Sequence, residues 1–308
     1  MAGLYKSTTT PADKRKAFKD ALTSGNIVTL PGAFNPLSAR LIQDLGGFGG
    51  VYLSGAVLAN DLGLPDIGLT TLTEVATRAG QVARATDLPV LVDADTGFGE
   101  PMSAARTVSE LESAGLAGCH LEDQVNPKRC GHLDGKEVVA TDVMVRRIKA
   151  AAEERTDDNF IICARTDAAG VEGIDSAIER AKAYADAGAD LIFTEALYTR
   201  EDFEKFRAAV DTPLLANMTE FGKTELQSAT TLGDIGYNAV IWPVSAFRVA
   251  MGAAEEFYGD LRDKGIQTDW LERMQHRSRL YELVRYEEYN AFDTSVFTYS
   301  KDTYKPTF

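Results

Sequence analysis

Eight short apolar segments alternate with helix-like segments along most of the chain, and this alternation limits the folds open to it. The first segment is Ile27-Val28-Thr29-Leu30 and the last is Ala239-Val240-Ile241-Trp242. Strands that are apolar on both faces are typical of a parallel sheet covered by helices. Eight strand–helix units in 308 residues therefore predict an α/β fold, a (β/α)8 barrel of the TIM type. The main alternative, a doubly wound open sheet, usually has fewer units and a glycine-rich first turn, which this chain lacks.

The predicted elements follow one another closely. We expect strands at residues 27–30, 51–54, 89–95, 118–123, 160–165, 191–195, 213–217 and 239–242. We expect helices at residues 13–24, 36–45, 73–86, 103–113, 142–155, 175–187, 201–210 and 247–261. Residues 56–71 contain Gly63, Pro65 and Gly68 and predict a long loop, a feature that is often functional. The whole pattern predicts a single domain over residues 1–308, with an N-terminal helix, a barrel over about 25–262 and a helical extension over about 263–308.

The C-terminal extension is rich in aromatic residues, which include Tyr281, Tyr286, Phe292 and Phe297. A barrel that already has its own helices offers such an extension little surface to pack on. Exposed aromatic residues of this kind more often contact a neighbouring subunit. We therefore expect an oligomer in which the extension packs on a neighbouring subunit.

The net charge of −14 restricts the partners of the chain. A protein that binds nucleic acid needs a basic face, so nucleic acid is not an expected partner. An anionic small molecule would need a local cluster of cations. No apolar run approaches the roughly 20 residues needed to cross a bilayer, so we expect no membrane association, and the N-terminus has no secretory signal. The three cysteines, Cys119, Cys130 and Cys163, are too few for a disulfide framework, and we expect reduced thiols and a cytoplasmic location.

Acidic side chains gather where predicted strands end. In a (β/α)8 barrel, the catalytic groups lie at the C-terminal ends of the strands. Asp93 and Asp95 end the third strand two residues apart, so we expect both carboxylates on one face. Two close carboxylates repel unless a cation lies between them, and oxygen ligands suit Mg2+. Glu122 and Glu195 end other strands and could hold metal-bound water. The alternative is that the two aspartates only cap the following helix.

The loop from Leu121 to His132 concentrates reactive groups. It carries Lys128, Arg129, Cys130 and His132 within five residues. Neighbouring cations lower the pKa of a thiol, so Cys130 is a candidate catalytic residue, and His132 could orient it or the substrate. No second cysteine or histidine stands at zinc-ligand spacing. Cys119 and Cys163 lie inside strands and are expected to be small buried apolar residues.

Cations that could bind a carboxylate ligand are few in this acidic chain. The candidates are Lys128, Arg129, Arg165, Arg248 and Arg277. Arginine binds carboxylates through two parallel hydrogen bonds. Most arginines are only solvated, but Arg165 ends an apolar strand and Arg129 stands beside a cysteine. These two are therefore the stronger candidates.

Two motifs resemble those of a known superfamily. Lys128-Arg129-Cys130-Gly131-His132 resembles the signature loop of the isocitrate lyase and phosphoenolpyruvate mutase superfamily. Asp93-Ala94-Asp95-Thr96-Gly97-Phe98-Gly99 looks like its metal motif. The resemblance extends from Pro31-Gly32-Ala33 to Met274-Gln275-His276-Arg277. Within the superfamily the chain is most similar to the 2-methylisocitrate lyases, because it is short and because of Asn217-Met218-Thr219-Glu220-Phe221-Gly222.

The resemblance implies a cofactor, an assembly and a reaction. The cofactor is Mg2+, with Mn2+ as an alternative, held by Asp93 and Asp95 with support from Asp66 and Glu122. The assembly is a homotetramer with exchanged C-terminal helices. The reaction is the cleavage of a tricarboxylate, 2-methylisocitrate, to pyruvate and succinate in the methylcitrate cycle of propionate catabolism. The substrate-binding residues that it implies are Ser54, Gly55, Ala56, Cys130, Gly131, Arg165, Glu195, Asn217, Met218, Thr219, Arg248 and Arg277.

The residues are compatible with a retro-Claisen cleavage. Tyr52 is the candidate base that removes the hydroxyl proton, and Cys130 is the candidate acid that protonates the carbon released with succinate. Arginine, asparagine and threonine donors would stabilise the charge that develops on the succinate half. Two alternatives stay open. One is another lyase or decarboxylase of the superfamily, such as isocitrate lyase, dimethylmalate lyase or oxaloacetate decarboxylase. The other is a non-catalytic barrel that binds dicarboxylates.

Overall fold

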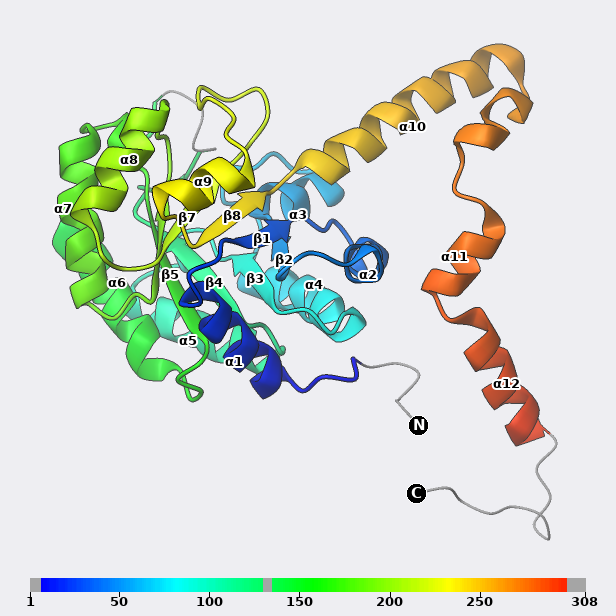
Figure 1. Cartoon of the computed structure of the whole chain (residues 1–308), viewed down its shortest axis with the longest axis horizontal. Helices are drawn as coiled ribbons and strands as arrows, with labels where there is room; N and C mark the ends of the chain where they lie inside the picture. Colours follow the sequence, from blue (N-terminus) through cyan, green and yellow to red (C-terminus); the bar gives the residue numbers. More distant parts are fainter. Residues whose placement is uncertain (1–6, 130–134, 298–308) are drawn as a thin grey trace, which may run out of the picture.

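A parallel eight-stranded barrel forms the centre of the molecule (Figure 1). The computed structural model describes residues 7–129 and 135–297. The strands are β1 (Val28–Pro31), β2 (Val51–Leu53), β3 (Val90–Asp93), β4 (Gly118–Glu122), β5 (Ile161–Thr166), β6 (Leu191–Thr194), β7 (Leu214–Asn217) and β8 (Ala239–Trp242). They are ordered β1-β8-β7-β6-β5-β4-β3-β2. A bridge between Gly32 and Tyr52 and a 2.9 Å hydrogen bond from Ala33 N to Tyr52 O bring β1 and β2 together. The predicted (β/α)8 barrel is confirmed.

The described residues form twelve α-helices, most of which surround the barrel on its outer side, while the first lies across one end and the last three lead away from it. They are α1 (Pro11–Leu22), α2 (Pro36–Leu45), α3 (Gly55–Asp61), α4 (Leu72–Ala85), α5 (Pro101–Ser113), α6 (Thr141–Glu154), α7 (Ile174–Asp186), α8 (Arg200–Ala209), α9 (Ala229–Ile235), α10 (Ser245–Lys264), α11 (Arg277–Leu283) and α12 (Tyr286–Phe297). Two short 3-10 helices, η1 (Ala168–Gly170) and η2 (Thr268–Arg273), complete the described elements. Most predicted elements are confirmed to within two or three residues at each end.

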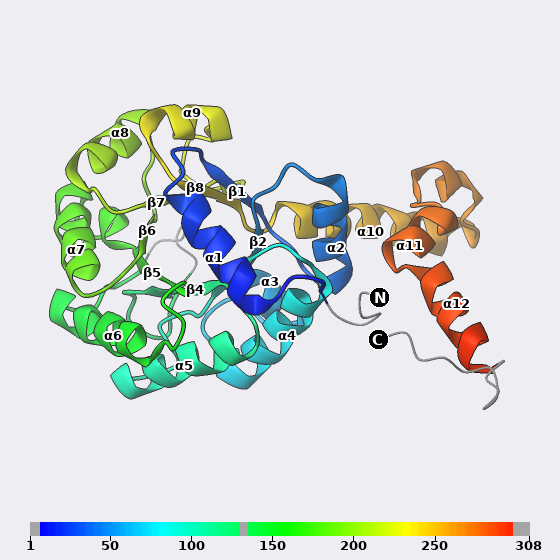
Figure 2. The same cartoon turned by 60° about the horizontal axis from the view of Figure 1, so that its bottom comes forward.

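One end of the barrel is closed by α1, which lies across it in Figure 2. Phe18 and Leu22 of α1 are buried against residues that begin the strands, among them Val28 and Ile161. These residues belong to the cluster that fills the barrel interior. A second cluster fills the layer between the strands and the outer helices. The polar residues at the other ends of the strands are therefore left as the open mouth of the barrel.

The prediction of a loop over residues 56–71 is wrong in its first part. Residues Gly55–Asp61 form α3, which begins directly after the end of β2. Ser54 is its N-cap but makes no side-chain capping bond, so the usual signal for a helix start is weak. Residues 62–71 do form a loop, which ends where Thr71 and Glu74 form a capping box for α4. A second helix outside the predicted ranges is α9, which begins at Ala229 between β7 and β8.

The C-terminal arm, made of α10, η2, α11 and α12, departs from the barrel (Figures 1 and 2). None of the 20 residues of α10 is buried, and Val249 and Tyr258 are 73% and 66% exposed. The arm touches its own barrel again at α2, where Arg40 Nη1 donates a 3.2 Å hydrogen bond to Leu283 O. Trp270 of the arm is buried, but other aromatic residues stay exposed, among them Phe292 (51%) and Phe297 (89%). No helix in the described ranges combines the length and apolar character that crossing a membrane requires.

Candidate active site

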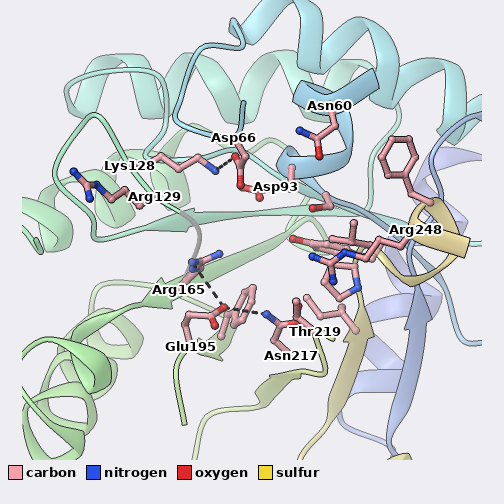
Figure 3. Close-up of a pocket in the computed structure, with 18 of the residues that line it drawn as sticks. Asn60, Asp66, Asp93, Lys128, Arg129, Arg165, Glu195, Asn217, Thr219 and Arg248 are labelled. Carbon is pink, nitrogen blue, oxygen red and sulfur yellow. Dashed lines mark hydrogen bonds and ion pairs between the residues drawn. The ribbon is translucent and has the colours of Figure 1, made fainter. Parts of the chain in front are cut away.

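A cavity of about 160 Å³ lies at the C-terminal ends of the strands (Figure 3). Its lining comprises Tyr52, Ser54, Ala56, Asn60, Asp66, Asp93, Lys128, Arg129, Arg165, Phe193, Glu195, Asn217, Thr219, Ile241, Pro243, Val244, Phe247, Arg248 and Met251. The predicted residues among them come from seven of the eight strands, β2 to β8, or from the segments that follow those strands. The structure thus gathers most of the predicted site residues around one cavity.

Asp93 and Asp95 lie together at the mouth, but for a different reason from the one predicted. The strand β3 ends at Asp93, and Asp95 follows it with φ 47°, in the left-handed region. Aspartate tolerates this conformation better than most residues, and strained backbone of this kind often accompanies function. Asp95 N donates a 2.9 Å hydrogen bond to Asp93 Oδ1, and Gly55 N donates one of 3.1 Å to Asp93 Oδ2. A Cβ on Gly55 would stand 2.8 Å from that same oxygen, so only glycine fits here.

Lys128 joins this cluster from the other side. Its side chain is 3% exposed, and Nζ lies 2.8 Å from Asp95 Oδ1 and 2.5 Å from Asp66 Oδ1. We expected Lys128 to bind a carboxylate of the substrate. In the structure, the carboxylates that it contacts are those of the protein itself, and Asp66 is drawn into the site as predicted (Figure 3).

The aspartate pair has the electrostatics of a cation site. Burial and the neighbouring Asp93 carboxylate raise the pKa of Asp95 to about 6. Burial also opposes ionisation of Asp93, but His120, Lys128 and Arg165 outweigh it and lower the pKa of this carboxyl. Glu122 lies close by and is fully buried, and its Oε1 accepts no hydrogen bond from the described residues. Oxygen donors with this surplus of negative charge fit a hard divalent cation such as Mg2+.

Arg165 is the central cation of the opposite wall, where it lies beside Glu195 (Figure 3). Its Nε lies 2.9 Å from Asp167 Oδ2 and 3.2 Å from Glu122 Oε2, and its Nη2 lies 3.7 Å from Glu195 Oε2. The guanidinium also stands 5.1 Å from the centre of the Phe193 ring. Burial raises the pKa of Glu122 well above its usual range, although Arg165 works against this shift. Burial thus acts against the ionised form of Glu122, while the neighbouring Arg165 and Lys128 act in its favour.

Tyr52 and His120 form a buried pair beneath the cavity. Tyr52 Oη and His120 Nε2 lie 2.8 Å apart, and the two rings are stacked. Burial, followed by the charge of Asp93, raises the pKa of Tyr52 well above its usual value. Burial lowers the pKa of His120 to about 4. These surroundings favour the neutral forms of both groups, and the role of Tyr52 as a base stays a prediction.

Asn217 and Thr219 complete the polar wall beside Glu195. Asn217 Nδ2 donates a 3.1 Å hydrogen bond to Glu195 Oε2, and Thr219 Oγ1 donates one of 2.7 Å to Asn217 Oδ1. The amide of Asn217 is thereby oriented by a neighbour on each side. Met218 lies between them in sequence but is buried away from the cavity, where its Sδ accepts a hydrogen bond from Gln227 N. The structure gives Met218 a packing role.

The remaining predicted residues differ in their position relative to the cavity. Arg248 lines the cavity from α10 and pairs with Glu220, whose Oε2 lies 2.8 Å from Nη1. Arg277 is exposed at the start of α11 and is not among the residues that line the cavity. Its predicted role would need a neighbouring subunit. Cys130, Gly131 and His132 lie outside the described residues, so their predicted roles stay predictions.

Sequence patterns did not identify the apolar part of the cavity. Phe193 and Ile241 come from β6 and β8, and Val244, Phe247 and Met251 come from the start of α10 and the turn before it. In sequence these residues are indistinguishable from core residues. Asn60 was also missed because α3 was not predicted. The available signal was its position after a strand end, since residues there face the mouth of such a barrel.

The geometry can now be compared with known proteins. The sequence of residues 18–261 matches the phosphoenolpyruvate phosphomutase family. The chain belongs to this family. Phosphoenolpyruvate phosphomutase family members therefore provide the context for the cavity, and their barrel is the fold found here.

Individual relatives of known name or structure agree with this family assignment. A probable 2-methylisocitrate lyase of Corynebacterium glutamicum is 75% identical over 308 residues and covers 100% of both chains. The solved structure of a 2,3-dimethylmalate lyase has a TM-score of 0.86 at 32% identity, covering 97% of this chain and 99% of that one. A phosphonopyruvate hydrolase in complex with oxalate and Mg2+ has a TM-score of 0.84 at 26% identity, covering 92% and 99%.

Proposed function

We propose that this chain is a carbon–carbon lyase that cleaves 2-methylisocitrate to pyruvate and succinate. The observation that carries the proposal is the polarity of the cavity. Asp93, Asp95 and Asp66 form one side of the site, and Arg165, Asn217 and Thr219 form the other. A tricarboxylate with one end chelated by a cation and another bound by hydrogen-bond donors matches this division. The 75% identity to a probable 2-methylisocitrate lyase over the full length supports the choice of substrate.

Mg2+ is the proposed cofactor, with Mn2+ as an alternative, and Asp93 and Asp95 would hold it. Asp66 and Glu122 would support the site, since both lie within this cluster of acids and cations. When bound, the cation would act as a Lewis acid toward the oxygen atoms of the 2-oxo acid half. The Mg2+ complex of the phosphonopyruvate hydrolase supports this assignment.

The other roles fall to side chains of this chain. Arg165 and Asn217 would bind the carboxylate on the succinate side, where negative charge develops as the bond breaks. Ser54 and the backbone around Gly55 and Ala56 would contact the pyruvate half. Cys130 is the proposed general acid, with Lys128, Arg129, Gly131 and His132 in the same loop.

The deciding experiment is an assay of 2-oxo acid release from 2-methylisocitrate and isocitrate, side by side, with Mg2+ and with EDTA. We expect pyruvate from 2-methylisocitrate in Mg2+, little glyoxylate from isocitrate, and neither product in EDTA. Comparable glyoxylate would contradict the preference for the methyl group. Absence of 2-oxo acid from both substrates would contradict the assignment as a whole.

A second candidate is a related carbon–carbon lyase such as dimethylmalate lyase. It is favoured by the TM-score of 0.86 against a 2,3-dimethylmalate lyase, over 97% of this chain. Its substrate would use the same aspartate pair and Arg165. Cleavage of 2,3-dimethylmalate faster than 2-methylisocitrate in the same assay would support it.

The assembly and cellular role follow from the same proposal. We propose a homotetramer in which the arm of one subunit packs on another, because α10 has no buried residue within its own chain. A cytoplasmic location and a place in the methylcitrate cycle of propionate catabolism would suit the proposed reaction.

A further inference from the structure

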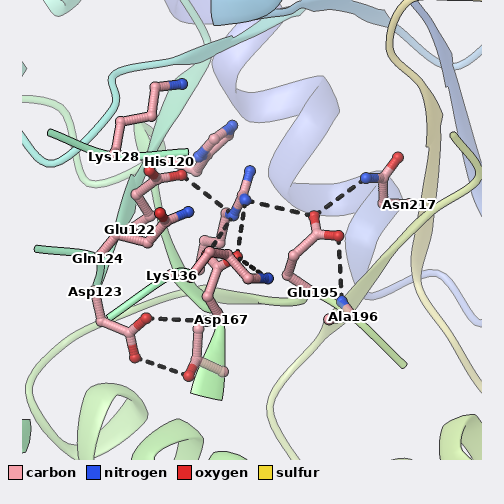
Figure 4. Close-up of polar contacts among 12 residues, drawn as sticks. His120, Glu122, Asp123, Gln124, Lys128, Lys136, Asp167, Glu195, Ala196 and Asn217 are labelled. Carbon is pink, nitrogen blue, oxygen red and sulfur yellow. Dashed lines mark hydrogen bonds and ion pairs between the residues drawn. The ribbon is translucent and has the colours of Figure 1, made fainter. Parts of the chain in front are cut away.

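A buried lysine stands behind the substrate arginine. Lys136 Nζ lies 3.1 Å from Asp167 Oδ1, and the side chains of Lys136 and Asp167 are 5% and 0% exposed. Asp167 in turn accepts two hydrogen bonds from Arg165, one of 2.9 Å from Nε to Oδ2 and one of 3.1 Å from Nη2 to Oδ1. Figure 4 shows Lys136 beside Asp167, and the carboxylate of Asp167 is therefore shared by Lys136 and Arg165. Only Arg165 of these three side chains lines the cavity.

The backbone holds both ends of this arrangement in place. Residues 135–139 return alongside the segment that follows β4, with a bridge between Gln124 and Val138. Val125 N donates a 2.8 Å hydrogen bond to Glu137 O, which flanks Lys136 on its C-terminal side. Asp167 N donates a 2.9 Å hydrogen bond to Asp123 Oδ1. The backbone of Asp167 is thus held by Asp123, and Lys136 approaches the Asp167 carboxylate from a separate segment.

The ammonium of Lys136 also packs in a defined space. A Cβ built on Gly170 would stand 3.5 Å from Lys136 Nζ. Gly170 ends the 3-10 helix η1, which directly follows Asp167. The lysine is therefore surrounded by the turn after β5, so a solvated surface position does not describe it.

Carboxylates of the protein surround the guanidinium of Arg165. Asp167, Glu122 and Glu195 all lie within 4 Å of the guanidinium. A guanidinium whose charge is fully offset by protein carboxylates attracts an anionic ligand weakly. Charges in a site with little water interact strongly. A second cation beside Asp167 therefore changes the electrostatic potential that Arg165 produces in the cavity.

We propose that Lys136 is a positioning residue for ligand binding, which acts through Asp167 to keep the positive field of Arg165 available to a carboxylate in the cavity. Asp167 still aligns the guanidinium by its two hydrogen bonds. Lys136 offsets the charge of Asp167, so that this alignment does not cancel the attraction for the ligand. The inference rests on the proposed function only in taking Arg165 as the partner of a ligand carboxylate.

The test measures binding of succinate to the full chain in Mg2+ by calorimetry, beside steady-state kinetics with 2-methylisocitrate. For Lys136→Met we expect the Kd for succinate and the KM to rise about tenfold, with a smaller change in kcat. Lys136→Arg, which keeps the charge, should restore the Kd to within about threefold of the unchanged chain. Lys182→Met is the matched control, because Lys182 pairs with Glu179 on the exposed face of α7 and should leave both constants unchanged.

A double-mutant cycle separates action through Asp167 from direct contact with the ligand. In an Asp167→Asn background, Lys136→Met should have little further effect on the Kd, because the charge that it offsets is gone. An undiminished effect in that background would overturn the proposal. An unchanged Kd for folded Lys136→Met would also overturn it. So would a lower Tm and a weaker binding of succinate in both Lys136→Met and Lys136→Arg, because that result would indicate a structural role. If the chain without substitutions binds succinate but does not cleave 2-methylisocitrate, the proposed function is contradicted. The role of Lys136 can still be tested by the binding of succinate.

Discussion

The position of Lys128 shows what neighbouring residues do to one another at the site. Its ammonium lies between Asp66 and Asp95, so three charged groups that are distant in sequence share one small space. The proposed cation would compete with this ammonium for Asp95. Both aspartates of the pair are therefore expected to matter for metal binding.

Asp95→Asn should weaken binding of Mg2+ by about 100-fold or more, because it removes one of the two proposed carboxylate ligands. Calorimetric titration of the folded variant with Mg2+ would measure this change. Asp142→Asn is a suitable control, since Asp142 is exposed and pairs only with Arg146 on the surface of α6. Equal affinity in the Asp95→Asn chain would exclude this residue as a ligand.

Cys130→Ser should reduce turnover of 2-methylisocitrate by about 100-fold or more, because a serine hydroxyl is a far weaker acid than a thiol. Binding of Mg2+ and succinate should stay unchanged, which calorimetry would check. Turnover close to that of the unchanged chain would remove Cys130 from the mechanism. Cys119→Ser is not a fair control, because Cys119 is fully buried in β4.

His120 predicts how stability depends on pH. Its pKa is about 4 in the folded chain, below the ordinary value of 6.5, because burial disfavours the charged ring. The unfolded chain therefore binds the proton more tightly, and the stabilisation present above pH 6.5 is lost as the pH falls toward 4. The Tm, measured in EDTA, should decline across this window. In His120→Gln the decline should be smaller, and an identical slope in both chains would contradict the assignment to His120.

The identity of the site residues was more predictable than their contacts. Motifs at the strand ends indicated Asp93, Arg165 and Asn217 correctly as neighbours of one cavity, and Asp95 lies directly beside Asp93. They could not indicate that Lys128 pairs with Asp66, because such a contact depends on how two distant loops fold onto each other. For the same reason, residues of the apolar wall such as Phe247 could not be told from core residues.

At the scale of elements, local chemistry decided which predictions succeeded. Each strand lies between clear turn signals, and the range predicted for β8, Ala239–Trp242, is the one observed. The short helix α3 was missed because it has only seven residues and lacks a side-chain cap. Short helices depend on packing more than on their own sequence. The buried residues Val57 and Leu58 provide that packing here.

The capping box of α4 should contribute measurably to stability. Thr71 Oγ1 accepts a hydrogen bond from Glu74 N, while Glu74 Oε2 accepts one of 2.8 Å from Thr71 N. Thr71→Ala should lower the free energy of unfolding by about 1 kcal/mol. Urea denaturation would measure it. Thr73→Ala, in the first turn of the same helix and exposed, should cost less, and an equal loss in both variants would contradict a role for the cap.

At the scale of the whole molecule, the C-terminal arm is the part least stabilised by contacts within its own chain. The predicted boundary near residue 262 lies close to the end of α10 at Lys264, but α10 itself has already left the barrel. A helix that buries none of its residues gains little from its own chain. The strand pattern could reveal the barrel, whereas the direction of the arm has no counterpart in the strand pattern, and in the proposed tetramer it would depend on contacts with other subunits.

Val249→Asp should shift the assembly toward smaller species, because Val249 is 73% exposed within one chain and would be covered by a neighbour. Light scattering should give the unchanged chain a mass of about four times 33.4 kDa. Lys182→Asp, on the exposed face of α7, should keep that mass. A monomeric mass for the unchanged chain at micromolar concentration would contradict the proposed tetramer.

The closure of one barrel end by α1 governs the order of events in a cleavage reaction. Phe18 and Leu22 leave no passage through that end, so the substrate enters and both products leave by one opening. A cavity of about 160 Å³ does not let two product molecules exchange places. The product nearer the opening must therefore depart first, and the other product stays bound until the first has left. Steady-state kinetics should show this as two unlike patterns of product inhibition, with only the last product to leave competing directly with substrate.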